Sequence, residues 1–398
     1  MATERIEFEN ADGVKLAGAL ELPPGRVRGA ALFAHCFTCT KQSRAATRIT
    51  RALARIGIAT LRFDFTGLGG SDGDFANGGF ASDVADVVSA AGYLERRFGD
   101  GVLLVGHSLG GAAVLAAAHH VPRVHAVATI GAPSDVPHVL EQFRGDLEAI
   151  ERDGEGEVEI AGRPFRVGRK FIQSVRGADV LSAVGSLKMP LLIMHSPVDE
   201  VVGVDHARQL YEAAFHPKSF VSLDDADHLM VKDRDAHYAA GVIAAWAERY
   251  LPEAAIEAPD EGVLVEMGHG KFGTQVYAGS HAFVADEPKK VGGEDLGPTP
   301  YDLLLSALGT CTVMTMKMYA DRKGYDVTAL SVQLTHDSHH EEDCEHILND
   351  KDAQIQAIWK TIKVDGDLSD EEREKIVAIA EKCPVNRTLT GHLHIHSR

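Results

Sequence analysis

The pentapeptide Gly106-His107-Ser108-Leu109-Gly110 constrains this chain more than any other feature. An apolar run, residues 102–105, precedes it, and an alanine-rich stretch, residues 112–119, follows it. A Gly-x-Ser-x-Gly motif between a strand and a helix is typical of a nucleophile elbow, whose tight turn requires small residues around the serine. Ser108 would then lie at a helix N-terminus, where amide dipoles favour negative charge. The alternative is an ordinary glycine-rich turn.

Short apolar runs alternate with helical runs over residues 1–251. This pattern predicts an α/β domain with a doubly wound, mostly parallel sheet. The expected strands are residues 30–35, 58–63, 102–105, 124–130, 191–195 and 219–223. The expected helices are residues 43–56, 80–97 and 112–121.

One segment interrupts the alternation, because residues 133–189 are too many for an ordinary connection between two strands. Within it, residues 157–168 predict a β-hairpin with its turn at Ala161-Gly162. We interpret the segment as a small cap over Ser108. The alternative is a surface insertion with no role at the site.

A serine hydroxyl is a weak nucleophile, so it needs a base, and the base needs a group that orients it. Asp199 ends the loop after strand 191–195, and His228 lies in the loop after strand 219–223, which gives the order Ser, Asp, His. Asp205 is the rival for the acid. For the oxyanion we expect two backbone N–H donors, those of Phe37 and Leu109.

With these residues the chain from about 5 to 250 resembles the α/β-hydrolase fold. Residues 63–71, Phe-Asp-Phe-Thr-Gly-Leu-Gly-Gly-Ser, resemble the Asp-x-x-Gly-x-Gly-x-Ser turn of that family, and we interpret this turn as structural. The resemblance implies a carboxylesterase-like enzyme with an acyl-serine intermediate, acting on small to medium acyl esters. It does not distinguish esters from thioesters or lactones.

The pattern changes after residue 251. Residues 252–261 contain two prolines and four acidic residues and predict a linker, and residues 262–398 predict a smaller α+β domain. Strands are expected at 263–267 and 274–278, and helices at 300–322 and 369–383. Each helix carries a cysteine on its apolar face, Cys311 and Cys383. Packing alone explains a buried cysteine in many proteins.

The residues around these cysteines, 297–315 and 383–389, resemble the OsmC/Ohr superfamily over about 262–398. That family reduces organic hydroperoxides with thiols and forms intertwined homodimers. The resemblance implies that Cys311 attacks the peroxide, that Cys383 closes a disulfide, and that a dithiol reductant restores both. It also implies an organic hydroperoxide as a second small-molecule substrate.

Two positions depart from the pattern of the active peroxidases. Tyr301 stands where they have a glutamate, and no arginine occurs between Arg249 and Arg322, which leaves Lys271 as the candidate cation. A buried cysteine without a nearby positive charge has a raised pKa and is unreactive. The alternatives are therefore a domain that only holds two hydrolases together, or a chain whose main activity is hydroperoxide reduction.

Composition excludes several function classes. A net charge of −18 argues against nucleic acid and anionic membrane surfaces as partners.

The first ten residues lack the pattern of a signal peptide, and we expect no spanning helix and a cytoplasmic location. The five cysteines are then expected to be reduced thiols, with Cys36-x-x-Cys39 serving packing rather than metal or redox chemistry. No cofactor or metal site is expected, and the histidine-rich residues 336–346 are interpreted as a solvated loop, with adventitious metal binding as the alternative.

Overall fold

The computed structural model describes residues 2–37, 39–99, 101–137, 140, 147–160, 163–252, 261–340 and 354–397. By its internal contacts the chain divides into two compact units, Met1–Val284 and Ala285–Arg398. The predicted linker, residues 252–261, falls almost wholly outside the described residues and stays a prediction.

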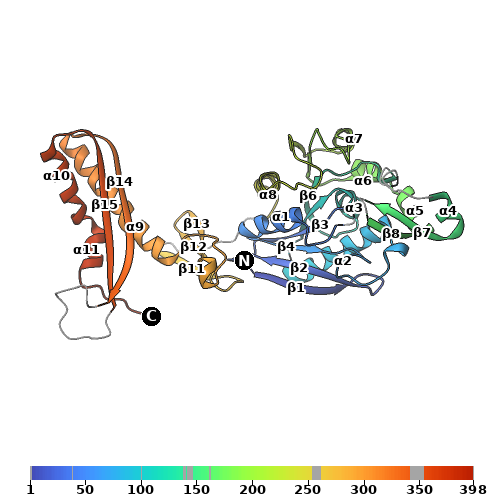
Figure 1. The fold of residues 1–398 in the computed structure, drawn as a ribbon, viewed down its shortest axis with the longest axis horizontal. Helices are drawn as coiled ribbons and strands as arrows, with labels where there is room; N and C mark the ends of the chain where they lie inside the picture. The colour runs from blue at the N-terminus through green and yellow to red at the C-terminus, as the bar shows by residue number, and fades with distance from the viewer. Residues whose placement is uncertain are drawn as a thin grey trace. The chain divides into compact units, whose positions relative to one another are not determined.

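An eight-stranded sheet forms the centre of the first unit (Figure 1). Its order is β1-β2-β4-β3-β5-β6-β9-β10. Six neighbouring strands pair in parallel, in the order β4, β3, β5, β6, β9 and β10. Strand β2 pairs antiparallel with β4 on one side and with β1 on the other. The bounds are β1 Ala2–Glu9, β2 Lys15–Leu22, β3 Gly29–Ala34, β4 Ile58–Phe63, β5 Val102–His107, β6 Val124–Ile130, β9 Leu191–His195 and β10 Lys218–Ser222.

Helices cover both faces of this sheet, so its central strands are apolar along their whole length. Helices α1 (Arg44–Arg55) and α8 (Asp233–Ala247) pack on one face. The other face is covered by α2 (Phe80–Phe98), α3 (Leu109–Ala117), α6 (Val180–Ser186) and α7 (Asp205–Ala213). This is the doubly wound arrangement that the alternation of strands and helices predicts.

The predicted strands and helices of the first unit all occur, with ends that differ by a few residues. Strands β4, β6 and β9 have the predicted bounds. The antiparallel pair β1–β2 and the helices α7 and α8 were not predicted as individual elements. Asp64 explains the turn at residues 63–71, because its carboxylate accepts hydrogen bonds from the N–H groups of Lys41 and Gly70.

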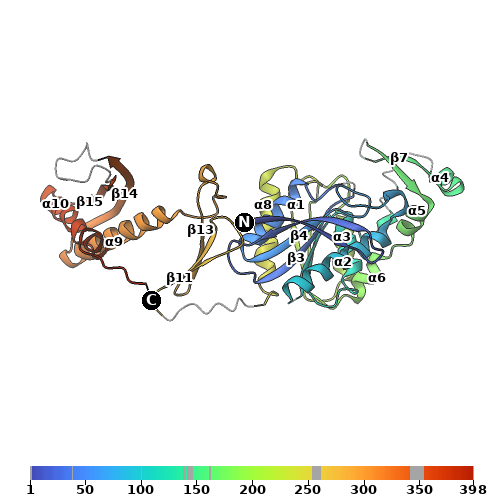
Figure 2. The ribbon, with the colours of Figure 1, turned by 90° about the horizontal axis from the view of Figure 1, so that it is seen from below.

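The segment between β6 and β9 contains the predicted hairpin, formed by β7 (Glu155–Ile160) and β8 (Arg163–Gly168) in an antiparallel pair. Its turn, residues 161–162, lies outside the described residues. Helices α4 (Leu147–Asp153) and α5 (Arg169–Arg176) flank the hairpin. The four elements gather at one end of the first unit, as Figure 2 shows.

The last part of the first unit forms a separate three-stranded sheet with the order β11-β12-β13. The strands are β11 Val263–Met267, β12 Thr274–Ala278 and β13 His281–Ala285. Arg26 forms an ion pair of 2.6 Å with Glu266 of β11. By contacts this sheet belongs with the first unit, although the sequence pattern placed it in the second domain.

In the second unit the long helix α9 (Pro300–Lys323) packs against the antiparallel pair β14 (Asp326–His340) and β15 (Gln354–Asp367). Helix α10 (Asp370–Ile379), a 3-10 turn at Ala380–Lys382 and helix α11 (Pro384–Thr390) follow. Two capping boxes start α9 and α10, at Thr299 and Ser369. Helix α9 is long and apolar enough to cross a membrane by length and composition alone. Helices in the core of a protein meet the same criteria, so the expectation of no spanning helix stays a prediction.

Candidate active site

Ser108 lies in the tight turn between β5, which ends at His107, and α3, which begins at Leu109. Its backbone has φ 55° and ψ −126°, a conformation that a residue with a side chain adopts only when its surroundings hold it there. The N–H of Ser108 donates to the main-chain oxygen of Ile130 (2.8 Å), and its own carbonyl accepts from Gly111 (2.8 Å). The turn is therefore tied to the neighbouring strand β6.

The glycines of the motif are required by close backbone contacts. A Cβ atom at Gly106 would overlap the backbone of Gly110, and one at Gly110 would overlap the carbonyl oxygens of Ala34 and His35. A side chain at Gly110 would push the turn away from the end of β3, and one at Gly106 would push the start of α3 away from β5. The motif thus has the geometry of a nucleophile elbow, and the role of Ser108 as the nucleophile stays a prediction.

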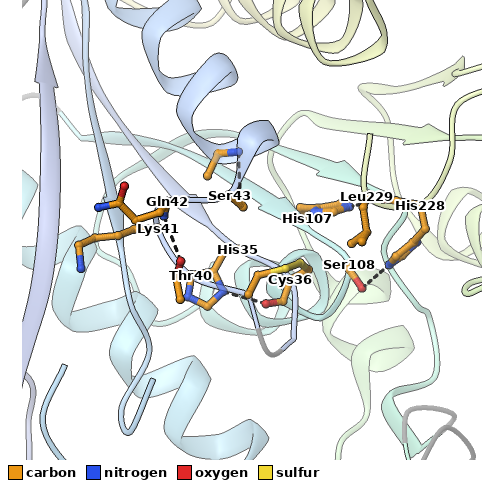
Figure 3. Close-up of a disulfide and its surroundings, with 12 residues drawn as sticks. His35, Cys36, Thr40, Lys41, Gln42, Ser43, His107, Ser108, His228 and Leu229 are labelled. Atoms are coloured by element: carbon orange, nitrogen blue, oxygen red, sulfur yellow. Dashed lines mark hydrogen bonds between the residues drawn. A yellow bond between two sulfur atoms is a disulfide. The ribbon is translucent and has the colours of Figure 1, made fainter. Parts of the chain in front are cut away.

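The structure brings Ser108, His228 and Asp199 together in a hydrogen-bonded row. Figure 3 shows the contact between Ser108 and His228. His228 Nδ1 lies 2.7 Å from Asp199 Oδ2, and His228 Nε2 lies 2.9 Å from Ser108 Oγ. A carboxylate can only accept, so Nδ1 carries the hydrogen and Nε2 accepts from the serine hydroxyl. This is the arrangement in which a histidine can take the proton of a serine.

The side chain of Asp199 is buried, yet the pKa of its carboxyl is not raised. Burial raises the pKa of its carboxyl, but the hydrogen bond and charge of His228 and the N–H groups of Val201 and Val202 lower it, and the net pKa lies below its ordinary value. Both N–H groups lie 2.9 Å from Asp199 Oδ1. Asp205, the rival acid, begins α7 and pairs with Arg208 instead.

Buried histidines surround this row and are held neutral. Burial, together with the charge of nearby His228, lowers the pKa of His107 to about 3. Burial also lowers the pKa of His195, which lies 3.8 Å from Asp199 and 2.7 Å from the carbonyl oxygen of Val202. Neither residue was predicted, because a chain with twenty histidines gives no sequence signal for them.

Phe37 and Leu109, the expected oxyanion donors, line one small cavity together with His35 and Gly110. The carbonyl oxygen of Cys36 accepts from His35 Nδ1 (2.8 Å) and from the N–H of Cys39 (3.1 Å). A peptide unit is planar and trans, so fixing the Cys36 carbonyl also fixes the direction of the Phe37 N–H.

Cys36 and Cys39 form a disulfide in this loop. The expectation that all cysteines are reduced, with this pair serving only packing, is therefore wrong. Spacing and the lack of a signal-peptide pattern could not reveal it, since a C-x-x-C pair is compatible with thiols, metal or disulfide. The two other described cysteines, Cys311 and Cys383, are free thiols as expected.

Aromatic side chains connect the predicted cap to the loop after β3. The ring of Phe37 lies 5.9 Å from that of Phe171 in α5 and 5.7 Å from that of Phe75. Phe165 of β8 contacts Phe75 in turn, with ring centroids 5.4 Å apart. The segment between β6 and β9 thus packs against the loop that carries the expected oxyanion donor.

A second cluster lies in the other unit around Cys383, which is buried. Thr312 Oγ1 lies 3.5 Å from its sulfur, and the N–H of Asn386 donates to it at 3.2 Å. Burial raises the pKa of the Cys383 thiol, but these two groups, a hydrogen bond with Cys311 and the charge of Lys360 lower it, and the net pKa is below its ordinary value.

The cation that acts on this cluster is Lys360 of β15, a residue the sequence did not single out. It also pairs with Glu381 at 2.7 Å. Lys271, the candidate from sequence, belongs to the first unit and lies over the ring of its neighbour Phe272. Tyr301 stacks on His336, with ring centroids 4.2 Å apart.

Among the residues that the structure describes, no group of three or more His, Cys, Asp or Glu side chains could hold a metal ion. Most of the histidine-rich residues 336–346 fall outside that part, so their interpretation stays a prediction.

Two family models match the chain. One, described as serine aminopeptidase S33, matches residues 25–150, and the other, described as OsmC-like protein, matches residues 292–398. The esterase domain of a Rhodothermus marinus protein is 45% identical, with a TM-score of 0.53, and the match covers 63% of this chain and 99% of that domain.

More distant proteins also match a part of the chain. The palmitoyl-protein thioesterase ABHD10 of Rattus norvegicus, named as mitochondrial, is 27% identical over 52% of this chain and 71% of its own length. Est1E of Butyrivibrio proteoclasticus, solved with ferulic acid, is 21% identical with a TM-score of 0.53, and the match covers 62% of this chain and 98% of that one. At that identity the likeness to Est1E concerns the fold alone.

Proposed function

Because the chain belongs to the α/β-hydrolase family and carries an OsmC-like domain after its hydrolase part, we propose that it is a serine esterase for small to medium acyl esters. The observation that carries this proposal is the row Ser108–His228–Asp199, with its two hydrogen bonds of 2.9 and 2.7 Å. The 45% identity to a protein described as an esterase domain supports the same reaction class.

In the proposed reaction Ser108 Oγ attacks the acyl carbon while His228 Nε2 takes its proton. The oxyanion that forms is held by the N–H groups of Leu109 and Phe37, and the N-terminus of α3 adds favourable dipoles. His228 then returns the proton to the leaving alcohol, and water hydrolyses the acyl-serine by the same steps. Asp199 keeps the imidazole in the required tautomer throughout.

The similarity to the thioesterase ABHD10 makes thioesters the competing class of substrate. A series of oxygen esters and thioesters with matched acyl chains decides between the two classes. We expect p-nitrophenyl acetate, butyrate and octanoate to be hydrolysed with a higher kcat/KM than the acyl-coenzyme A thioesters of the same chain lengths. Ser108→Ala serves as the background in each assay. Faster turnover of the thioesters would replace the proposal with a thioesterase.

A second activity, reduction of organic hydroperoxides, is supported by the lowered pKa of Cys383 beside Cys311. A cysteine thiolate attacks the O–O bond, releases the alcohol and becomes a sulfenic acid, and the other cysteine displaces water to form a disulfide. A dithiol then reduces that disulfide. We expect consumption of cumene hydroperoxide with dithiothreitol to require Cys311 and to survive in Cys36→Ser/Cys39→Ser. No rate above background in the unsubstituted chain would leave the second unit without this activity.

We also propose that the second unit pairs with a second copy, as the OsmC resemblance implies. Helix α9 exposes Met314 (64%) and Met318 (73%), and a cavity of about 540 Å³ lies between α9 and β14. Apolar surface of this kind is normally covered. Met314→Asp in the full chain is expected to give monomers in light scattering, whereas Met267→Asp, at an equally exposed position in the first unit, leaves the dimer intact. A monomeric unsubstituted chain would contradict this role.

A further inference from the structure

The Cys36–Cys39 disulfide lies beside the proposed active site, yet the hydrolytic reaction makes no use of it (Figure 3). Both cysteines line a cavity of about 180 Å³ whose other walls are the start of α1, His107, and Leu229 and Val231 of the loop that follows His228. The disulfide is thus in contact with the surroundings of both the nucleophile and the base.

The disulfide closes the turn that orients the expected oxyanion donor. The Cys36 carbonyl accepts hydrogen bonds from His35 and from the N–H of Cys39, and this fixes the Phe37 N–H on the other side of the same peptide plane. One of these two donors belongs to Cys39 itself. Any change that lets Cys39 move away from Cys36 therefore removes one of the two hydrogen bonds that fix the Phe37 amide.

The loop is held by hydrogen bonds on both sides of this turn. The bond between the two sulfurs is therefore the link in the loop that a thiol reagent can break. Before the turn, β3 is paired on both edges, with β4 and β5. After it, the N–H of Lys41 donates to Asp64 Oδ1 at 2.6 Å and its ammonium group pairs with the same carboxylate. Ser43 then caps α1 by accepting from the N–H of Ala46.

A thiol reagent can reach this disulfide from one side. Cys36 is buried, whereas Cys39 is half-buried. The exposed Arg44, which lines the same cavity, gives positive charge that favours an incoming thiolate. A cavity of about 180 Å³ is smaller than most ligand pockets, so a small dithiol fits this site better than a folded protein.

We propose that Cys36–Cys39 is a thiol–disulfide exchange site for a small dithiol, and that its redox state sets the esterase rate, a consequence that rests on the proposed function. A thiolate of the dithiol attacks Cys39 Sγ, the S–S bond breaks, and Cys36 leaves as a thiolate that takes up a proton. The second thiol of the reagent attacks the mixed disulfide and releases Cys39. The pair gains two electrons and two protons, and the dithiol becomes a cyclic disulfide.

Reduction is expected to lower kcat and leave KM nearly unchanged, because the Phe37 amide binds an oxyanion that exists only during the reaction. Loss of a whole oxyanion donor costs about 10²–10³ in kcat, and a loosened donor costs less. We therefore expect a fall of about tenfold, reversed on reoxidation.

The test uses the full chain with Cys311→Ser, Cys344→Ser and Cys383→Ser, so that only Cys36 and Cys39 can exchange. The folded protein is equilibrated in mixtures of reduced and oxidised dithiothreitol. Free thiols are counted by maleimide mass tagging, and hydrolysis of p-nitrophenyl butyrate is measured after rapid desalting. The control adds Cys36→Ser/Cys39→Ser. If the triple variant does not fold, peptide mapping of the unsubstituted chain gives the same thiol count.

We expect two thiols to appear in the folded chain while kcat falls, and the control to show one low rate at every mixture. The proposal is overturned if the disulfide resists reduction until denaturant is added. It is also overturned if both thiols form and kcat does not change. If no ester is hydrolysed in either state, the proposed esterase function has failed, and the thiol count alone decides whether the exchange site exists.

Discussion

His107 holds the loop of the proposed base, because its Nε2 lies 2.7 Å from the main-chain oxygen of His228. This bond requires a hydrogen on Nε2, in the residue next to the proposed nucleophile. Burial lowers the pKa of His107 to about 3, so the folded chain keeps it neutral over most of the acid range. The consequence is a pH-dependent stability.

The direction in which the unfolding free energy changes with pH follows from the protonation of His107 in the folded and unfolded chain. The unfolded chain protonates a histidine below about pH 6.5, whereas the folded chain protonates His107 only near pH 3, so its contribution is complete above pH 6.5 and is lost as the pH falls. We expect His107 to account for about 2 kcal/mol of the loss in unfolding free energy between pH 7.5 and pH 5. Urea unfolding of His107→Gln should show a shallower pH dependence by that amount. The control His120→Gln changes an exposed histidine, and an equal slope in all three proteins would contradict the assignment.

Asp199 is expected to orient His228, and Asp205 is expected to have no part in the reaction. Asp199→Asn keeps the shape but allows the wrong imidazole tautomer, so kcat for a p-nitrophenyl ester should fall by about 10⁴. Asp205→Asn, which removes only a surface pair with Arg208, should leave kcat within about twofold. Equal losses in the two variants would argue against Asp199 as the orienting acid.

Gly110 is expected to be essential for the fold of the elbow. A methyl group there would overlap the carbonyl oxygens of Ala34 and His35, so Gly110→Ala should lower the unfolding free energy by about 2 kcal/mol or more. Gly241→Ala is the matched control, because Gly241 lies in α8 with open space around it and alanine favours helix by about 0.5–1 kcal/mol. Denaturant midpoints test both, and an unchanged midpoint for Gly110→Ala would show that the turn can move aside.

Lys360 is expected to stabilise the thiolate of Cys383. In a chain whose other cysteines are serine, ultraviolet absorbance of the thiolate should appear at lower pH than for an ordinary thiol. Lys360→Gln should move that transition to higher pH, because it removes the nearby positive charge. Lys363→Gln, at an exposed position on the same strand, should not move it. Identical titrations of both variants would exclude Lys360 as the source.

The alternation of strands and helices and the place of Ser108 could be predicted because local signals decide them. The motif at residues 106–110 needs only its own small residues and the flanking apolar runs. Asp199 and His228 follow their strands directly, and the geometry brings both to Ser108.

Other features depend on contacts between residues distant in the sequence. Lys360 acts on Cys383 because β15 pairs with β14, which packs on α9, and because α11, which follows Cys383, also packs on α9. The sequence around Lys360 or around Cys383 does not predict this proximity. Likewise, His107 gains its role from a bond to a residue 121 positions away. The state of Cys36 and Cys39 could not be decided from spacing, since it depends on the turn that brings the two sulfurs together.

The most direct test of the proposed esterase is the acyl-enzyme itself. Intact mass spectrometry after rapid mixing with p-nitrophenyl acetate should show one acetyl group on the unsubstituted chain, located by peptide mapping on Ser108, together with a burst of p-nitrophenol. Ser108→Ala should show neither and should retain the unfolding midpoint of the unsubstituted chain. Full turnover by Ser108→Ala, or an acetyl group at another residue with a normal rate, would contradict the account.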